Sequence, residues 1–120
     1  LSVSYSKERQ AFGRPIAGFQ AIRHKVAEMA TKAAAARTLT YDTLRRFEQG
    51  EDVVREVSMA KLFTQRTLVE IADEALQIHG GYGYMKEYEV ERALRDARLG
   101  PIGGGTDEIM KEIIGKTFSL

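Results

Sequence analysis

Two long segments of the chain, residues 17–49 and 52–79, carry apolar residues at steps of three and four positions. This spacing gathers apolar side chains on one face of an α-helix, which then packs against a core. The stripe of the first segment consists of Phe19, Ile22, Val26, Met29, Ala33, Ala36, Thr40, Leu44 and Phe47. The stripe of the second consists of Val57, Ala60, Thr64, Leu68, Ile71, Ala75 and Ile78. Because only a short connection around Gly50 separates the segments, we expect two antiparallel neighbouring helices.

The second segment is apolar on more than one side, which is typical of a helix that is buried on two sides. Its further apolar residues are Met59, Leu62, Val69 and Leu76. Shorter helices are expected over residues 87–98 and 106–118, and residues 1–10 resemble the end of another helix. No stretch favours a strand. The sequence therefore predicts an all-α bundle whose first helix is truncated.

Composition bounds the possible partners of this chain. Its 120 residues fit one domain, and 18 Lys+Arg against 17 Asp+Glu give no charge excess that would favour nucleic acid or an anionic membrane. No apolar run is long enough to span a membrane. The absence of cysteine excludes disulfides and thiolate nucleophiles. We expect a cytoplasmic location, or the mitochondrial matrix in a eukaryote.

Three glycine-containing stretches are candidates for function. The first is Arg9-Gln10-Ala11-Phe12-Gly13-Arg14-Pro15, followed by Phe19-Gln20. One interpretation is a loop between helices with solvated arginines. The other places Arg9 on a phosphate, because a guanidinium group pairs with phosphate through two parallel hydrogen bonds.

The second stretch is Gln77-Ile78-His79-Gly80-Gly81-Tyr82-Gly83-Tyr84. A glycine pair after a long helix normally caps it, but the missing side chains would also let a cofactor approach the backbone. We expect His79 to be a helix-end residue rather than a metal ligand, since it has no metal-ligand spacing with His24. The sequence predicts no metal site.

The third stretch is Gly103-Gly104-Gly105-Thr106-Asp107-Glu108-Ile109. The three glycines suit either a flexible hinge or a loop whose amides bind an anion or another ligand. Thr106 is a good N-cap for the last helix, and Asp107 and Glu108 suit the positive end of its dipole. No GK[ST] sequence follows, so this is not a Walker phosphate loop.

In this order and spacing, the three stretches resemble the acyl-CoA dehydrogenase family. The matching residues are Tyr5 to Gly13, Phe19-Gln20, Gln77 to Gly83, Arg95-Asp96-Ala97-Arg98 and Gly103 to Ile109. The resemblance covers residues 5–117 and accounts for about the last third of a typical family member. It implies that residues 1–120 form a single domain of a larger enzyme. That domain would be a four-helix up-and-down bundle of the acyl-CoA dehydrogenase C-terminal type, at the centre of a homotetramer.

The resemblance also implies FAD as the cofactor, held partly by this domain. It makes Arg9 a contact of the FAD pyrophosphate and Phe12 a packing contact, on FAD bound to a neighbouring subunit. The further residues along that same FAD would be Gln20, Gln77, Gly80 and Gly81. Thr106 and Glu108 would contact the FAD of their own active site.

The family reaction forms the α,β double bond of an acyl-CoA thioester, with FAD accepting the hydride. Electrons usually pass on to an electron-transfer flavoprotein. In many members a glutamate just before the last helix is the catalytic base, and Gly104 stands at that position here. This glycine resembles the long-chain and isovaleryl branches, whose base comes from an earlier helix. The resemblance therefore assigns no catalytic residue to this chain, and we expect the chain alone to be inactive.

Two other functions remain open on the sequence. The chain could be a stand-alone helical interaction module that kept the fold and lost the chemistry. It could also belong to an acyl-CoA oxidase or another flavoprotein built on the same bundle.

Overall fold

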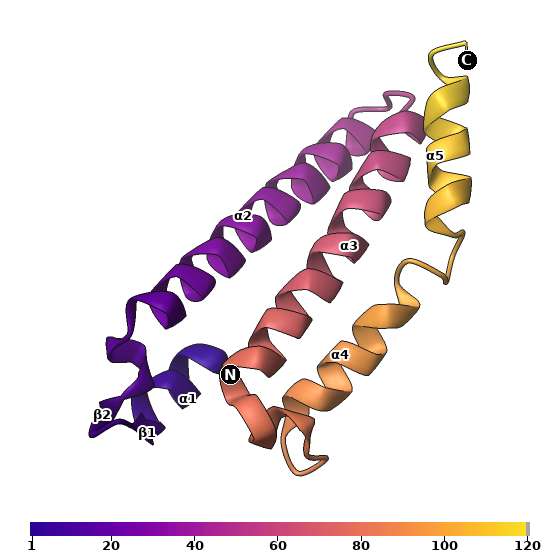
Figure 1. Cartoon of the computed structure of the whole chain (residues 1–120). Coiled ribbons are helices and arrows are strands. Elements are labelled where there is room, and N and C mark those ends of the chain that lie inside the picture. The colour runs from indigo at the N-terminus through magenta and orange to yellow at the C-terminus, as the bar shows by residue number, and fades with distance from the viewer. Residues whose placement is uncertain (120) are drawn as a thin grey trace.

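The structure, a computed structural model, describes residues 1–119 and consists mainly of helices (Figure 1). The α-helices are α1 (Ser2–Glu8), α2 (Gln20–Glu48), α3 (Val54–His79), α4 (Glu89–Leu99) and α5 (Asp107–Lys116). Short 3-10 turns span Ile16–Gly18 and Gly80–Tyr84. The all-α prediction is confirmed, and each long helix begins within three residues of its predicted start.

The central element is α3, which contacts α1, α2, α4 and α5. Figure 1 shows α2 antiparallel to α3, while α4 and then α5 return along another side of α3. The two-sided apolar pattern of α3 is thus explained, because the helix packs against α2 and against the α4–α5 arm. Gly50, with φ +80°, follows the end of α2 in the left-handed conformation that favours glycine.

The sequence prediction of no strand is wrong between residues 10 and 15. Two antiparallel strands of two residues each, β1 (Gln10–Ala11) and β2 (Arg14–Pro15), form a small hairpin there. Its turn has positive φ at both central residues, Phe12 (52°) and Gly13 (78°), as tight hairpin turns require. Strands this short carry no alternating pattern that a sequence could reveal. Residues 17–79, all of which the structure describes, contain no strand.

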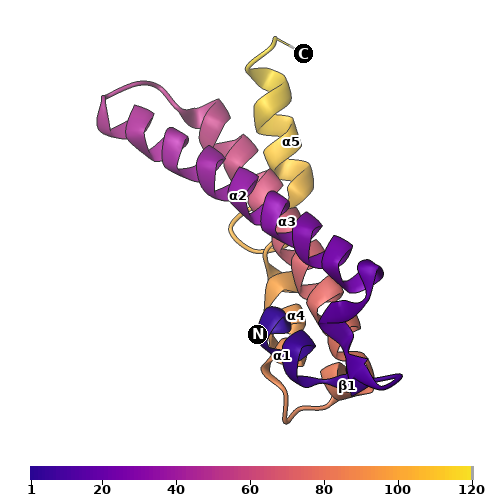
Figure 2. The same cartoon turned by 90° about the vertical axis from the view of Figure 1, so that its left-hand side faces the viewer.

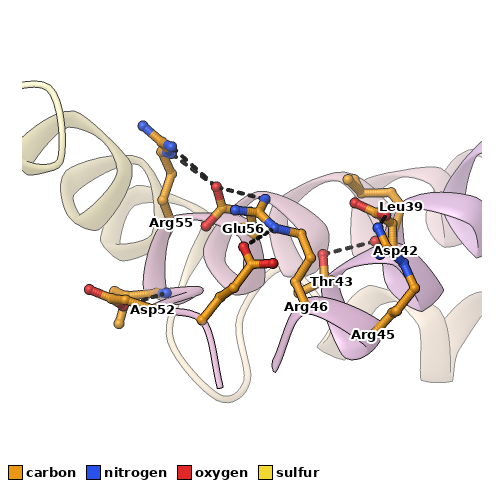
Figure 3. Close-up of polar contacts among 10 residues, drawn as sticks. Leu39, Asp42, Thr43, Arg45, Arg46, Asp52, Arg55 and Glu56 are labelled. Atoms are coloured by element: carbon orange, nitrogen blue, oxygen red, sulfur yellow. Dashed lines mark hydrogen bonds and ion pairs between the residues drawn. The ribbon is translucent and has the colours of Figure 1, made fainter. Parts of the chain in front are cut away.

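Ion pairs hold the turn between α2 and α3 (Figure 3). Arg46 lies 2.8 Å from Glu51 and 3.1 Å from Glu56, and Arg55 lies 3.2 Å from Glu56. A backbone hydrogen bond, together with Arg55 and Arg46, holds the pKa of Glu56 below its ordinary value. The end of one long helix is therefore tied to the start of the next.

The molecule is elongated and buries little for its size. Its extents are 58 × 24 × 24 Å and its radius of gyration is 17.5 Å, against about 13.6 Å for a compact domain of this length. It exposes 8158 Å², whereas a compact protein of 120 residues exposes about 6,500 Å². The buried apolar residues are Val53, Ala60, Ala72, Ile78, Val90, Ala97 and Met110. Within residues 1–119, no helix has the length and hydropathy of a membrane span.

Candidate functional site

The first two sequence stretches meet at one end of the molecule. Figures 1 and 2 show α1 and the hairpin beside the C-terminal end of α3. A cavity of about 560 Å³ lies at this junction. Its lining residues are Tyr5, Arg9, Ile16, Ile78, His79, Gly80, Gly81, Tyr82 and Met85. Residues some seventy positions apart in the sequence, from Arg9 to Gly80 and Gly81, are thereby brought to one surface.

The floor of this cavity is built around His79. The His79 ring is buried, stacks on the Tyr5 ring at 4.1 Å between centroids, and places Nδ1 2.7 Å from the carbonyl oxygen of Ala75. The Tyr5 hydroxyl donates to the His79 carbonyl at 3.3 Å. Burial raises the Tyr5 pKa, an effect that nearby Arg9 opposes, so the hydroxyl keeps the proton that it donates. His79 is a packed helix-end residue, as the sequence predicted.

Arg9 is fixed through its backbone and presents its side chain at the cavity. Its N–H donates to the Tyr5 carbonyl at 2.8 Å, and its own carbonyl accepts from the Ile16 N–H at 2.9 Å. The guanidinium carbon lies 5.0 Å from the centroid of the Tyr82 ring, within cation–π range. A guanidinium held in this way keeps donors for an anion such as phosphate.

Gly80 and Gly81 have no side chains to cover the backbone beside Arg9. A Cβ added at either glycine would meet no atom within 4 Å, and Gly80 has φ +57°. The Gly80 N–H donates to the carbonyls of Leu76 and Gln77, so this glycine also caps α3. Gly83 differs, because a Cβ there would lie 2.5 Å from the Leu76 carbonyl oxygen. The glycine pair therefore ends the helix, and it leaves open space beside its backbone. That a cofactor occupies this space stays a prediction.

Other residues predicted for the same ligand lie outside the lining of this cavity. Phe12 is 95% exposed at the hairpin tip, where its ring meets Phe19 edge-on at 6.1 Å. Gln20 begins α2 and Gln77 lies in the last turn of α3, and both are exposed. A ligand that touches them would have to extend beyond the cavity over the adjoining surface.

The third stretch forms a separate site farther along α3 (Figure 1). Thr106 caps α5, since its Oγ1 accepts from the Ile109 N–H at 3.3 Å. Glu108 is exposed in the first turn of α5. Gly104 and Gly105 have φ of +62° and +95°, and only glycine adopts such values without strain. The predicted residues therefore divide into an Arg9 group and a Thr106 group.

The sequence interpretation assigned no role to several residues that line or support these sites. Tyr5 and Tyr82 shape the Arg9 cavity, and Lys61 of α3 contacts the glycine loop before Thr106. Tyr5 stands four residues before Arg9, which is a neighbouring position on a helix and a usable signal. No pattern signals Lys61, because its partners are carbonyls some forty residues away. Among residues 1–119 no group of three or more His, Asp or Glu could hold a metal ion.

The fold defines a class of protein: an elongated helical bundle, in which the residues predicted to contact a ligand lie at two separate places on the surface. A family model described as "Acyl-CoA dehydrogenase, C-terminal domain" matches residues 1–118. The chain belongs to the acyl-CoA dehydrogenase family and corresponds to its C-terminal domain.

Curated relatives are similar along almost the whole chain. An acyl-CoA dehydrogenase of Bacillus subtilis is 50% identical over 96% of this chain and 30% of its own length. A 3-(aryl)acrylate reductase of Clostridium sporogenes is 47% identical over 98% of this chain and 31% of its own. The subunit CarC of the caffeyl-CoA reductase-Etf complex of Acetobacterium woodii is 44% identical over 94% and 30%. The chain thus spans about a third of the length of these relatives.

Solved structures share the fold closely. A probable acyl-CoA dehydrogenase from Mycobacterium abscessus aligns with a TM-score of 0.95 at 50% identity, covering 98% of this chain and 31% of that one. An FAD complex of PigA aligns with a TM-score of 0.93 at 29% identity, covering 99% and 31%. Both likenesses rest on sequence as well as on shape.

Proposed function

We propose that residues 1–120 are the C-terminal FAD-contacting and oligomerisation domain of a larger acyl-CoA dehydrogenase. That enzyme would form the α,β double bond of acyl-CoA thioesters, with FAD accepting the hydride. The observation that carries the proposal is the cavity that joins Arg9 to the bare backbone of Gly80 and Gly81. Family membership and the FAD complex of a structural neighbour support FAD as the ligand.

The Arg9 group fits the diphosphate end of such a cofactor. Arg9 offers a guanidinium for the pyrophosphate, and the glycine pair lets a bulky ligand lie against the end of α3. Exposed Phe12 would pack against the cofactor, and Gln20 and Gln77 would donate or accept hydrogen bonds along it. We assign this group to FAD bound by a neighbouring subunit.

The Thr106 group contacts a second FAD, which is the FAD bound in the active site of the same subunit. Thr106 and Glu108 stand at the start of α5, where the helix dipole and free N–H groups favour electron-rich ligands. Gly104 stands at the position of one family base and has no group that can accept a proton. We therefore place the protein in the long-chain or isovaleryl-like branch, with its base supplied from outside residues 1–120.

The proposed partners are acyl-CoA, further copies of the chain in a homotetramer, and an electron-transfer flavoprotein. The name of the Acetobacterium relative, a subunit of a reductase-Etf complex, supports the electron-transfer partner. The cysteine-free composition suits a reducing compartment, the cytoplasm or the mitochondrial matrix.

The isolated chain of residues 1–120 should self-associate through the apolar face of α2 and α3. We define this face by the exposed residues Leu44, Phe47, Val54 and Val57, which line two neighbouring cavities of about 470 and 510 Å³. Contiguous apolar surface of this kind is rare on monomers and marks an interface. Sedimentation at micromolar concentration should show dimers or larger species.

A matched pair of variants tests that face. Phe47→Asp should shift the chain toward monomer, because it puts a charge at the centre of the face. Ala34→Asp is the control, on the same helix but roughly 140° around its axis from Phe47. A monodisperse wild-type monomer, or equal effects of the two variants, would contradict the prediction.

The proposed activity is tested on the full-length protein. It should purify with bound FAD, and anaerobic addition of an acyl-CoA of suitable chain length should bleach the flavin absorbance. Since the relatives include reductases, the reduced enzyme should also be mixed with the matching enoyl-CoA. A protein that carries no flavin, or whose flavin responds to no thioester in either direction, would favour the stand-alone interaction module.

A further inference from the structure

The glycine loop before α5 is docked on one short stretch of α3. The Lys61 ammonium donates to the Gly100 carbonyl at 2.9 Å and also to the Gly105 carbonyl. One turn along α3, Gln65 packs so closely on Gly100 that a Cβ added there would lie 3.0 Å from the Gln65 Cβ. Arg66 then pairs with Asp107, with Nε 2.6 Å from Oδ2. Both ends of the loop, and the first residue of α5, are therefore fixed by α3.

Lys61 is an unusual residue to find in this position. It is only partly exposed and lines both cavities of the apolar face together with Phe47 and Val57. A cation in apolar surroundings costs free energy unless it is paired, and within residues 1–119 no carboxylate oxygen lies within 4.0 Å of this ammonium. Its compensation comes from two backbone carbonyl dipoles. An apolar side chain could fill the same space, but it could not donate hydrogen bonds to these two carbonyls.

The loop needs such a restraint because of its composition. Between the two carbonyls lie Gly103 and Gly104, and Gly104 and Gly105 both have positive φ. Glycine loses more conformational freedom on ordering than any other residue, so an unrestrained loop of this kind would sample many conformations. One ammonium that binds the carbonyls of Gly100 and Gly105 closes the loop into a ring and fixes the approach to Thr106.

We propose that Lys61 is a positioning residue of the active site: by binding the Gly100 and Gly105 carbonyls, it holds the loop that presents Thr106 and Glu108 to flavin and substrate. This inference rests on the proposed function for the identity of the ligand. The restraint of the loop by Lys61, which we call the clamp, rests only on the hydrogen bonds of Lys61 to the two carbonyls. Lys61 touches no reacting atom, and its effect is transmitted through the loop.

The test compares Lys61→Met with Lys111→Met in the full-length protein. Both changes remove a lysine charge, but Lys111 is exposed on α5 and serves as the control. In Lys61→Met the loop amides of residues 102–106 should exchange with deuterium roughly tenfold faster. Flavin reduction by acyl-CoA should slow by about tenfold or more, since small misplacements of contact groups are costly. FAD content should fall less than on loss of the Arg9 side chain, because the Arg9 group, which we assign to the FAD pyrophosphate, does not contact Lys61.

A conservative variant separates positioning from general stability. Lys61→Arg keeps charged donors and should restore flavin reduction to within about threefold of wild type, whereas Lys111→Met should match wild type in every measurement. If Lys61→Met does not fold, Lys61→Gln replaces it, with the same expected directions. Unchanged loop exchange, or faster exchange with an unchanged rate of flavin reduction, overturns the proposal. If the loop exchanges faster while wild type reduces no flavin with any thioester, the clamp stands and the proposed function fails.

Discussion

Arg9→Ala in the full-length enzyme should weaken FAD binding by about tenfold or more, which is the typical effect of losing a hydrogen bond between charged groups. The Arg9 backbone is held by hydrogen bonds to Tyr5 and Ile16. The Arg9 guanidinium lies over the Tyr82 ring at the cavity. Its removal should leave the bundle intact, because the side chain is exposed. The measurement is the fraction of FAD that stays bound after serial dilution, followed by flavin fluorescence.

Arg14→Ala is the matched control for that variant. Arg14 is also an exposed arginine of the hairpin, with its guanidinium carbon 4.1 Å from the centroid of the Phe19 ring, but it does not line the cavity. Its loss should change FAD retention little. Arg9→Lys should fall between wild type and Arg9→Ala, since it keeps the charge but not the two-pronged geometry. Full flavin occupancy of Arg9→Ala after dilution would show that the assignment of Arg9 is wrong.

Much of the fold could be predicted from the sequence because apolar residues recur every three to four positions along an amphipathic helix. The helices that the stripes predict, α2 and α3, are confirmed, and so is the N-cap Thr106, which was predicted from its residue type. The predicted burial of the stripes is only partial, because Leu44, Phe47, Val57 and Leu68 are exposed. The hairpin at Gln10–Ala11 and Arg14–Pro15 could not be read, since its register comes from the turn at Phe12 and Gly13 rather than from any apolar alternation. A turn that depends on the backbone angles of only two residues, Phe12 and Gly13, produces no periodic pattern in the sequence.

The sites were predictable in part. Glycines and an arginine, in a spacing that resembles the family, predicted the Arg9 and Thr106 groups, and the structure brings Arg9, Gly80 and Gly81 together at one cavity. The distant partners of the side chains that support those groups were not predictable, because these partners are backbone carbonyls. Tyr5 binds the His79 carbonyl and Lys61 binds two glycine carbonyls, and carbonyls are present at every residue. Such contacts are found only when the fold sets two distant segments side by side.

Residues 1–120 on their own should leave every acyl-CoA unoxidised and bind FAD only weakly. A general base contributes about 10²–10⁴-fold to a proton transfer, and it must lie within hydrogen-bond reach of the proton that it removes. Gly104 has no such group. Asp107, near the loop, is paired with Arg66. Hydrogen bonds from Arg95 lower the pKa of Glu91, which makes that carboxylate a weaker base.

Binding of FAD by the isolated chain should be weak for a geometric reason. Arg9 lies at the cavity beside the C-terminal end of α3, whereas Thr106 lies at the start of α5, so on the proposed function each group offers only one edge of a cofactor site. Mixing the chain with FAD, acyl-CoAs of short to long chain length and an artificial electron acceptor should give no bleaching near the visible maximum of the flavin. The full-length protein, assayed beside it, is the positive control. Substrate-dependent bleaching by the chain alone would mean that a base lies within residues 1–120, and exposed Glu108 at the start of α5 would be the first residue to replace.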